Sequence, residues 1–250
     1  MLRFLLSNKY IRNIVCFLRA FYFIKIKKKL VKYSKNSKYI WENTLESNLR
    51  HVYDEKLLPA HPKKLKNLLG VNLKFSGENI DYLYALLEDD FTDILNKKIL
   101  VVGPRNESEI LNLFGKGFNL KNIDAIDLFS YSPLVKLGDA HTYETSKNKY
   151  DFIFLGWVLA YSNNKELMIK NLKMLLKENG ILLVGYSANN IDDKEVLNKR
   201  GYLISSPTNR IRNEKDLNDF FLYNSLSIIK QNLISKKDTN IKVAFKLKKA

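Results

Sequence analysis

A glycine turn and two carboxylates are the residues of this chain whose types and spacing suggest chemistry. Residues 99–110, ILVVGPRNESEI, pass from an apolar run through Gly103 into a polar stretch that suits the beginning of a helix. Glycine permits a tight turn, and the free N–H groups at a helix N-terminus attract negatively charged groups. Asp127 and Asp139 each follow a later apolar run, and one carboxylate can accept hydrogen bonds from two hydroxyls. Together these residues are suited to holding a polar small molecule.

Few side chains are placed to transfer a proton or to line a pocket. Trp157 and Tyr161 follow the apolar run that ends at residue 155, where they could form a pocket wall, although core packing accounts for Trp157 equally well. His141, Tyr131 and Tyr161 are the candidates for an acid–base role, and a surface position is the simpler interpretation of His141. The sequence assigns a catalytic role to none of them.

Metal and disulfide chemistry find no support in the sequence. The three histidines, His51, His61 and His141, are scattered and lack the spacing of metal ligands. The single cysteine, Cys16, cannot form an internal disulfide. We therefore expect neither a metal site nor a disulfide framework.

The elements that must position these residues alternate along the chain from residue 98 onward. Apolar runs predict strands and amphipathic stretches predict helices, in an order that implies a parallel sheet with helical crossovers. The predicted strands span residues 99–102, 123–128, 135–137, 151–155 and 181–185, and the helices between them span residues 106–114 and 164–177. Asn179 and Gly180 are expected to end the second helix with a left-handed cap. A helix over residues 213–223 and strands over 225–231 and 241–247 then predict an antiparallel hairpin, with Lys236–Asp238 between its strands.

Three regions follow from this pattern. Residues 1–41 are a basic amphipathic N-terminal segment, residues 42–97 a helical lead-in, and residues 98–250 the main domain. Within the lead-in, apolar residues recur at helical spacing and predict a helix over residues 79–96.

The order of elements resembles the class I S-adenosylmethionine-dependent methyltransferases. The resemblance covers about residues 95–248 and is carried by four patterns: ILVVGPRNESEI at 99–110, IDAIDLF at 123–129, LGDAH at 137–141 and YDFIFLGWVLAYSNNKELMIKNLKMLLKENGILLVG at 150–185. It implies an α/β, Rossmann-like fold with a seven-stranded, mostly parallel sheet, a C-terminal antiparallel hairpin and a helical N-terminal extension. It also implies a methyltransferase enzyme whose cofactor is S-adenosyl-L-methionine.

The resemblance implies cofactor-binding roles for five residues. Gly103 would let the backbone turn against the cofactor, and Arg105 would pair with its methionine carboxylate. Asp127 would accept hydrogen bonds from the ribose hydroxyls, Asp139 would contact the adenine amino group, and Trp157 would line the pocket near the transferred methyl group. The alternatives are a solvated strand end for Asp127 and a turn-forming Gly-Asp pair for Asp139.

The chain departs from the family at the glycine turn. The family has an acid two residues before the first glycine and two further alternating glycines, where this chain has Val101, Arg105 and Glu107. The segment LGWVLAY also lacks the Asn/Asp-Pro-Pro-Tyr/Phe motif of enzymes that methylate the amino groups of nucleic-acid bases. The first departure leaves a non-catalytic protein with this fold as an alternative, and the second argues against that subgroup.

Basic charge is concentrated at the two ends of the chain. The net charge is +16, but residues 1–41 contain 11 Lys and Arg and no acid, and residues 236–250 contain six Lys and one Asp. Residues 42–235 have as many acidic as basic residues. Basic ends suit a negatively charged partner such as lipid headgroups, nucleic acid or an acidic protein. AT-rich coding is an alternative origin of the charge, since it also produces sequences rich in Lys, Asn and Ile.

The N-terminal segment is expected to form an amphipathic helix. One side carries Ile11, Ile14, Leu18 and Phe21 with Tyr10 and Phe17, and the other carries Asn8, Lys9, Arg12 and Arg19. Arg12 and Arg19 interrupt the apolar run, so we expect neither a membrane-spanning helix nor a secretory signal peptide. Such a helix can lie on an anionic membrane surface. The alternatives are that its apolar stripe packs on its own domain or that it contacts nucleic acid or protein.

These patterns predict methyl transfer to a small or membrane-linked acceptor, such as an envelope sugar or a lipid intermediate. The first alternative is an RNA methyltransferase whose basic ends follow phosphates, and nucleic acid is the less favoured partner. The second is a non-catalytic protein with a methyltransferase fold. The expected location is the cytoplasm, with residues 1–33 attaching the protein to the inner face of the membrane.

Overall fold

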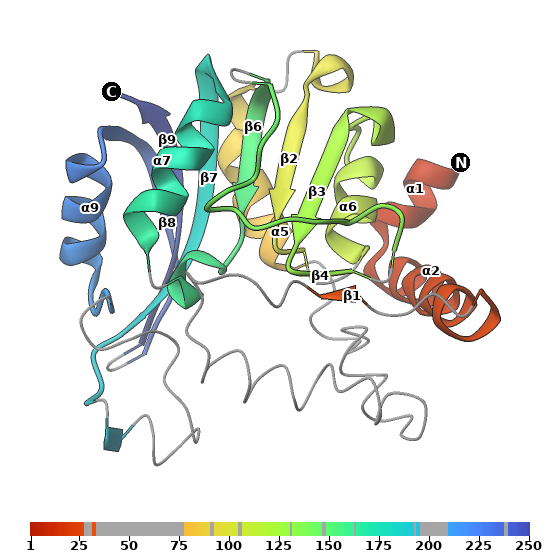
Figure 1. Cartoon of the computed structure of the whole chain (residues 1–250), viewed down its shortest axis with the longest axis horizontal. Helices are drawn as coiled ribbons and strands as arrows, with labels where there is room; N and C mark the ends of the chain where they lie inside the picture. Colours follow the sequence, from red (N-terminus) through yellow and green to blue (C-terminus); the bar gives the residue numbers. More distant parts are fainter. Residues whose placement is uncertain are drawn as a thin grey trace.

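The computed structural model shows a twisted sheet with helices on both faces and two N-terminal helices at one end (Figure 1). It describes residues 1–27, 32–33, 78–90, 93–104, 107–130, 132–146, 149–162, 164–192, 194–195, 210–237 and 240–250. Two residues with predicted roles, Arg105 and Tyr131, lie outside the described residues, as does most of the lead-in.

The core of the fold is a seven-stranded sheet. In spatial order its strands are β5 (Lys136–Leu137), β3 (Ile123–Asp127), β2 (Ile99–Val102), β6 (Tyr150–Leu155), β7 (Leu176–Asn189), β9 (Asn240–Lys249) and β8 (Leu226–Lys237). The first five run parallel to one another, whereas β9 is antiparallel to both β7 and β8. A separate two-stranded pair joins β1 (Lys32–Tyr33) to β4 (Phe129–Ser130). The predicted fold class, mostly parallel with a C-terminal antiparallel hairpin, is confirmed.

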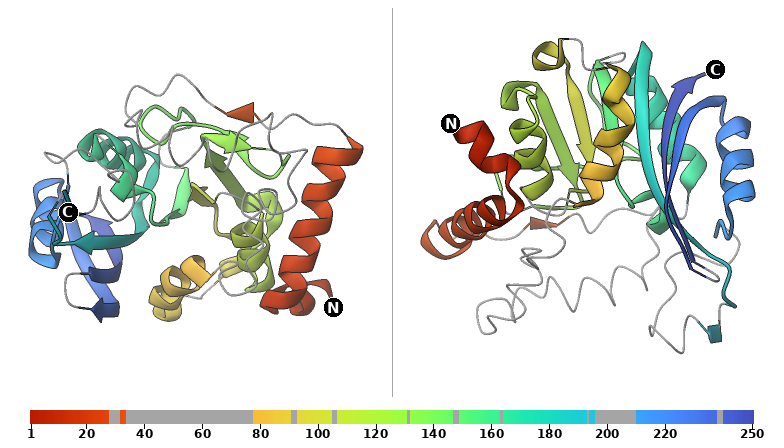
Figure 2. Two further views of the ribbon diagram at one scale, coloured as in Figure 1. Left: turned by 90° about the horizontal axis from the view of Figure 1, so that it is seen from below. Right: turned by 180° about the vertical axis from the view of Figure 1, so that it is seen from behind.

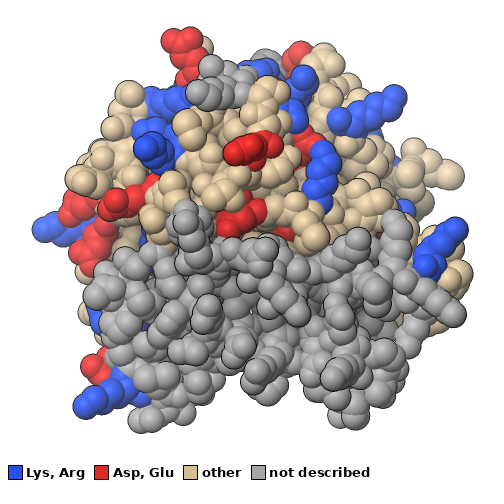
Figure 3. All heavy atoms as spheres, in the orientation of Figure 1, with Lys and Arg blue, Asp and Glu red and all other residues tan. Residues whose placement is uncertain are grey.

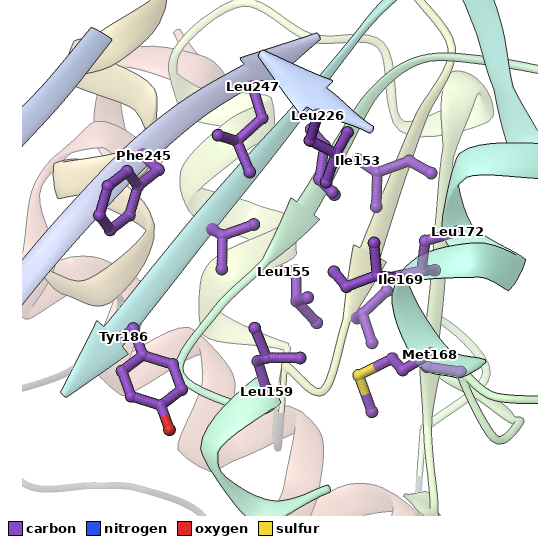
Figure 4. Packing of buried hydrophobic residues seen from close by; sticks show 14 of the residues in the cluster. Ile153, Leu155, Leu159, Met168, Ile169, Leu172, Tyr186, Leu226, Phe245 and Leu247 are labelled. Carbon is purple, nitrogen blue, oxygen red and sulfur yellow. The ribbon is translucent and has the colours of Figure 1, made fainter. Parts of the chain in front are cut away.

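Among the described residues, four helices cover the two faces of the sheet. They are α5 (Glu78–Tyr84), α6 (Ser108–Gly115), α7 (Lys165–Leu175) and α9 (Glu214–Tyr223). Alternate residues of β2 point to opposite faces: Leu100 packs in the cluster with α7 and α9, whereas Val101 packs in the cluster with α5 and α6. Figure 2 shows these layers from below and behind, and Figure 4 shows Ile169 and Leu172 of α7 against the sheet. Burial on both faces explains why β2 is apolar throughout.

The helix predicted over residues 79–96 is interrupted. The α-helix α5 ends at Tyr84, and a 3₁₀ helix, η2 (Ala85–Asp90), continues it. Asp93 then adopts a left-handed conformation, with φ 57°, before a short 3₁₀ turn, η3 (Ile94–Asn96). Apolar spacing predicted the buried face, which includes Ile80, but it did not reveal the change of helix type.

The predicted glycine cap after α7 is wrong. The helix ends at Leu175, and Leu176 already has extended backbone, with φ −71° and ψ 141°. Leu176 pairs with Tyr150, so strand β7 begins directly where the helix ends. Gly180 lies inside β7, and the positive-φ glycines among the described residues are Gly103 and Gly117. A left-handed residue is not needed to end α7, because the residue after the helix, Leu176, already pairs with β6.

The C-terminal hairpin has longer strands than predicted. Strand β8 extends to Lys237 and β9 begins at Asn240. Lys236 and Lys237, which were expected in the connection, therefore belong to β8. Their pairing with Ile241 and Asn240 continues the ladder to the tip of the hairpin.

The predicted N-terminal helix is divided into two helices at Asn8. Helix α1 (Leu2–Ser7) ends there, and the Asn8 side chain accepts hydrogen bonds from the N–H groups of Tyr10 and Ile11 at the beginning of α2 (Lys9–Phe21). This side-chain cap explains why a second helix begins at that residue. A π-helical turn, η1 (Tyr22–Ile26), follows α2. None of the described helices is long and apolar enough to cross a bilayer.

Helix α2 faces the domain with its polar side. Arg12 and Cys16 are buried, whereas Ile14 and Leu18 are 57% and 59% exposed. The alternative in which the apolar stripe packs on the protein's own domain is therefore wrong. The helix packs on its own domain through the opposite face.

Candidate functional site

Gly103 ends strand β2 and turns the chain toward α6. Its φ is +68°, in the left-handed region that glycine adopts at no steric cost. Its N–H donates to the carbonyl of Ile126 over 2.8 Å. A Cβ at this position would lie 2.2 Å from Cγ2 of Val158, in the segment after β6. Both the backbone conformation and the available space therefore require glycine.

Asp127 lies at the same edge of the sheet as Gly103. Val102 of β2 pairs with Ile126 of β3 in parallel register, so Gly103 and Asp127 each come one residue later at the carboxyl ends of neighbouring strands. The Asp127 side chain is half-buried. Open α/β sheets bind ligands outside the carboxyl ends of their strands. The structure thus brings these two predicted residues together where a ligand would bind.

Asp139 takes part in a chain of hydrogen bonds that includes His141. Its Oδ1 accepts from the backbone N–H of His141 over 3.0 Å and lies 2.5 Å from the Nδ1 atom of the same residue. Nε2 of His141 lies 2.7 Å from the hydroxyl of Ser162, after β6. These contacts join two loops at the carboxyl edge of the sheet. The surface position expected for His141 is wrong, since its side chain is 2% exposed.

A buried lysine adjoins this hydrogen-bonded chain. Lys165 begins α7, and its Nζ donates to the carbonyl of Ser162 over 2.7 Å. Burial lowers the pKa of Lys165 to about 8. The sequence did not reveal this residue, because a lysine in the first turn of an amphipathic helix ordinarily faces solvent.

Trp157 packs on the α5 side of the sheet. Its ring lies edge-on to Tyr82 with centroids 6.4 Å apart, and Nζ of Lys242 is 4.4 Å from its centroid. A Cβ on Gly185 would lie 2.5 Å from the indole ring. The buried Nε1 has no hydrogen-bond partner among the described residues. These contacts support the core-packing alternative for Trp157, whereas Tyr161 is 38% exposed.

Glu107, which stands where the family has a glycine, has contacts that the sequence did not predict. It follows the glycine turn and is fully buried, yet its carboxylate forms a bidentate ion pair with Arg19 of α2, at 2.5 and 3.0 Å. It also accepts a hydrogen bond from the hydroxyl of Ser132. Burial, together with the charge of Glu107, raises the pKa of the nearby Cys16 thiol to about 12. Glu107 thus ties α2 to the segment after Gly103.

An open hollow of about 610 Å³ lies between α7 and α9, away from these residues. Lys170, Lys173 and Lys249 contribute to its lining. Neither Gly103 nor Asp127 lines it. The hollow is therefore not part of the candidate site at the glycine turn.

Comparison with solved structures identifies the fold. No family model and no curated protein matches the chain. The solved structure of MccD protein matches with a TM-score of 0.53 and 12% identity, over 68% of this chain and 96% of that chain. N-methyltransferase NodS from Bradyrhizobium japonicum, in complex with S-adenosyl-L-homocysteine, matches with a TM-score of 0.51 and 16% identity, over 82% of this chain and 98% of that chain.

A third match is phosphoethanolamine N-methyltransferase 2 from Haemonchus contortus, in complex with phosphomonomethylethanolamine and S-adenosylhomocysteine. The TM-score is 0.52 with 12% identity, and the match covers 68% of this chain but 53% of that longer chain. At such identities the likeness is one of fold. The strand order and these neighbours show that the chain has the fold of the class I S-adenosylmethionine-dependent methyltransferases.

Proposed function

We propose that this protein is an S-adenosylmethionine-dependent methyltransferase that acts on a small or membrane-linked acceptor. The observation that carries the proposal is the placement of Gly103 and Asp127 side by side at the carboxyl edge of a sheet with the methyltransferase strand order. Two of the matching structures hold S-adenosylhomocysteine, the demethylated form of the cofactor, which supports the choice of cofactor.

The residues of this edge suit the polar groups of S-adenosylmethionine. Asp127 would accept hydrogen bonds from the ribose hydroxyls, and Gly103 would allow the backbone to come close to the cofactor. The bond between Asp139 and His141 fixes the Asp139 carboxylate, which would then meet the adenine amino group. Arg105, outside the described residues, would pair with the methionine carboxylate.

The bound cofactor would supply an electrophilic methyl group on its sulfonium sulfur. The contribution of the chain is then to align the acceptor with that group and to exclude water. Tyr161 is a partly exposed hydroxyl near the end of β6 and would line the acceptor side. His141 would hold the two edge loops in place through Asp139 and Ser162.

The distribution of charge supports a membrane-linked acceptor such as an envelope sugar or a lipid intermediate. Residues 1–41 are strongly basic, whereas residues 42–235 have no net charge. Figure 3 shows acidic and basic side chains interspersed over the described part of one face of the molecule. A neutral domain with a basic end suits attachment at the inner face of the membrane better than tracking along a phosphate backbone.

Isothermal titration of S-adenosylmethionine into the full chain tests the proposal. The Asp127→Ala variant should bind more weakly by about 1–3 kcal/mol, which is roughly 5–150-fold, because the ribose hydroxyls lose their acceptor. The matched control is Asp219→Ala, which removes an exposed carboxylate on α9 and should bind as the wild type does.

Other outcomes of this titration favour the alternatives. If the folded wild-type protein binds no S-adenosylmethionine, the non-catalytic alternative is favoured and the enzyme proposal fails. Tight binding to RNA that weakens steeply with salt would favour an RNA methyltransferase.

A further inference from the structure

A stripe of exposed apolar side chains runs along the outer side of α2. It comprises Tyr10, Ile14, Phe17, Leu18 and Phe21, which together we call the α2 outer face. Their exposed fractions range from 37% for Phe17 to 59% for Leu18. More than half of the exposed large hydrophobic side chains of the described residues belong to residues 1–26. A concentration of this kind marks an interaction surface.

The inner side of α2 is fixed by charged groups. Arg12 is 1% exposed, and its guanidinium donates to the carbonyls of Leu6 and Ser7 over 2.9 and 3.2 Å. Arg19 holds the buried carboxylate of Glu107. Turning the helix over would leave these groups without their partners, at a large cost. The α2 outer face is therefore held toward the outside.

The position of α2 in the fold leaves this face accessible. Figure 1 and both views of Figure 2 show α2 beside α6 at one end of the molecule, with α9 at the other end. On its inner side, Cys16 packs with Leu6 and Leu111 in a small apolar cluster. The helix thus packs on the domain through its inner side, while the side chains of the α2 outer face are exposed.

Basic side chains border the α2 outer face. At the beginning of α2, Nζ of Lys9 lies 5.5 Å from the centroid of Tyr10, which belongs to this face. Just beyond the end of α2, Nζ of Lys27 lies 5.9 Å from the centroid of Tyr22, the residue that follows Phe21. Residues 1–41 contain 11 Lys and Arg and no acid. Apolar and aromatic side chains beside cations suit the boundary between headgroups and acyl chains of an anionic bilayer. The phosphates of RNA would pair with the basic side chains, but RNA would give Ile14 and Leu18 no apolar contact.

We propose that the α2 outer face docks the protein on an anionic lipid bilayer. Ile14, Phe17 and Leu18 enter the interfacial region, while Lys9 and Lys27 face the lipid phosphates. Docking through this surface does not depend on methyl transfer, so vesicle binding and cofactor binding can each be present without the other. In combination with the proposed function, the contact of Arg19 with Glu107 links the docked helix to the segment after Gly103.

Vesicle flotation of the full chain tests this surface. We expect the wild type to float with phosphatidylcholine vesicles that contain about 30% phosphatidylglycerol, and at least about 10-fold less with pure phosphatidylcholine. The double variant Ile14→Ser, Leu18→Ser should lose at least about 10-fold of its binding to the anionic vesicles. The matched control, Leu222→Ser, Tyr223→Ser, removes two exposed apolar side chains from α9 and should bind as the wild type does.

The outcomes of these experiments distinguish a lipid bilayer from a second copy of the chain as the partner of the α2 outer face. Circular dichroism should show that all variants are folded, because each substituted side chain is exposed. If the wild type ignores anionic vesicles, or if the α2 and α9 variants bind equally, the proposal is overturned. If the wild type forms a dimer that the α2 variant abolishes, and vesicles do not compete with that dimer, the face belongs to a second copy instead.

Discussion

Helices α2 and α7 are both amphipathic and both pack on the same domain, but they do so with opposite sides. Helix α7 buries Met168, Ile169 and Leu172 against the sheet. Helix α2 buries Arg12 and exposes its apolar stripe. Apolar spacing therefore identifies the two faces of a helix without determining which one faces inward.

Charged contacts decide the orientation of α2. Burying Ile14 and Leu18 would contribute about 1.5–3 kcal/mol each. Turning the helix over would also strip the buried Arg12 and Glu107 of their partners, and breaking a buried ion pair costs about 3–5 kcal/mol. The two side chains together would contribute about 3–6 kcal/mol, so losing the Arg19–Glu107 pair offsets most of this gain. The buried contacts of Arg12 with the carbonyls of Leu6 and Ser7 add to the cost of turning the helix over.

The largest expected effect comes from the apolar side of α7. The substitution Leu172→Ala should lower the free energy of unfolding by about 2–5 kcal/mol, because Leu172 is fully buried and its removal leaves a cavity. The matched substitution on α2, Leu18→Ala, should change it by less than about 0.5 kcal/mol. Urea unfolding measures both values. Equal losses in the two variants would remove the contrast between these helices.

A smaller loss of stability is expected from disrupting the Arg19–Glu107 ion pair, which holds α2 on the domain. The substitution Glu107→Gln keeps the shape of the side chain but removes the charge that Arg19 contacts. It should destabilise α2 by about 1–3 kcal/mol, which would appear as faster amide hydrogen exchange in residues 9–21. Exchange in α7 should be unchanged, and Glu166→Gln, an exposed residue on α7, serves as the control. Protection of α2 that survives Glu107→Gln would show that other contacts hold the helix.

The smallest change in stability is expected from the charged contacts of Asp124 in β3. Like the Arg19–Glu107 pair, they join a carboxylate to basic side chains, but both sides of these contacts belong to the sheet domain. Burial alone would raise the pKa of Asp124, but hydrogen bonds from Lys149, Lys136 and Tyr150 outweigh it and lower the pKa to about 2. The folded pKa lies below the unfolded value of about 3.9. The stabilisation is therefore complete above that value and is lost as the pH falls through about 2.

The substitution Asp124→Asn tests this dependence. Since the carboxylate is 22% exposed, the variant should be less stable than the wild type at pH 6 by about 1–2 kcal/mol. The difference should shrink as the pH falls from about 4 toward 2. Urea unfolding at a series of pH values measures it. A difference that stays constant down to pH 2 would mean that the ionised form of Asp124 contributes nothing.

The sheet could be predicted from the sequence because its signals are local. Central parallel strands are buried on both faces, so residues 99–102 and 152–155 are continuous apolar runs. The turn at Gly103 could be predicted in the same way, since a glycine directly after a buried apolar run is typical of a tight turn. The glycine cap at Gly180 failed because strand pairing at Leu176, which is not a local property, ended the helix earlier.

The contacts around the candidate site could not be predicted, because they join distant parts of the chain. Arg19 and Glu107 are 88 residues apart, and His141 and Ser162 are 21 apart. Local patterns predicted a surface His141 and placed Arg19 on the polar side of its helix without naming a partner. Only the folded arrangement brings each residue to its partner and determines which side of α2 faces the domain.

The order of the last two strands has a consequence for synthesis on the ribosome. Strand β9 follows β8 along the chain but lies between β7 and β8 in the sheet. Until residues 240–249 have emerged, the nascent chain has an open edge along β7, in which residues 181–184 are apolar and buried in the folded protein. Open edges of this kind recruit other chains. The period before β9 is inserted is therefore when the newly made protein most needs protection from aggregation.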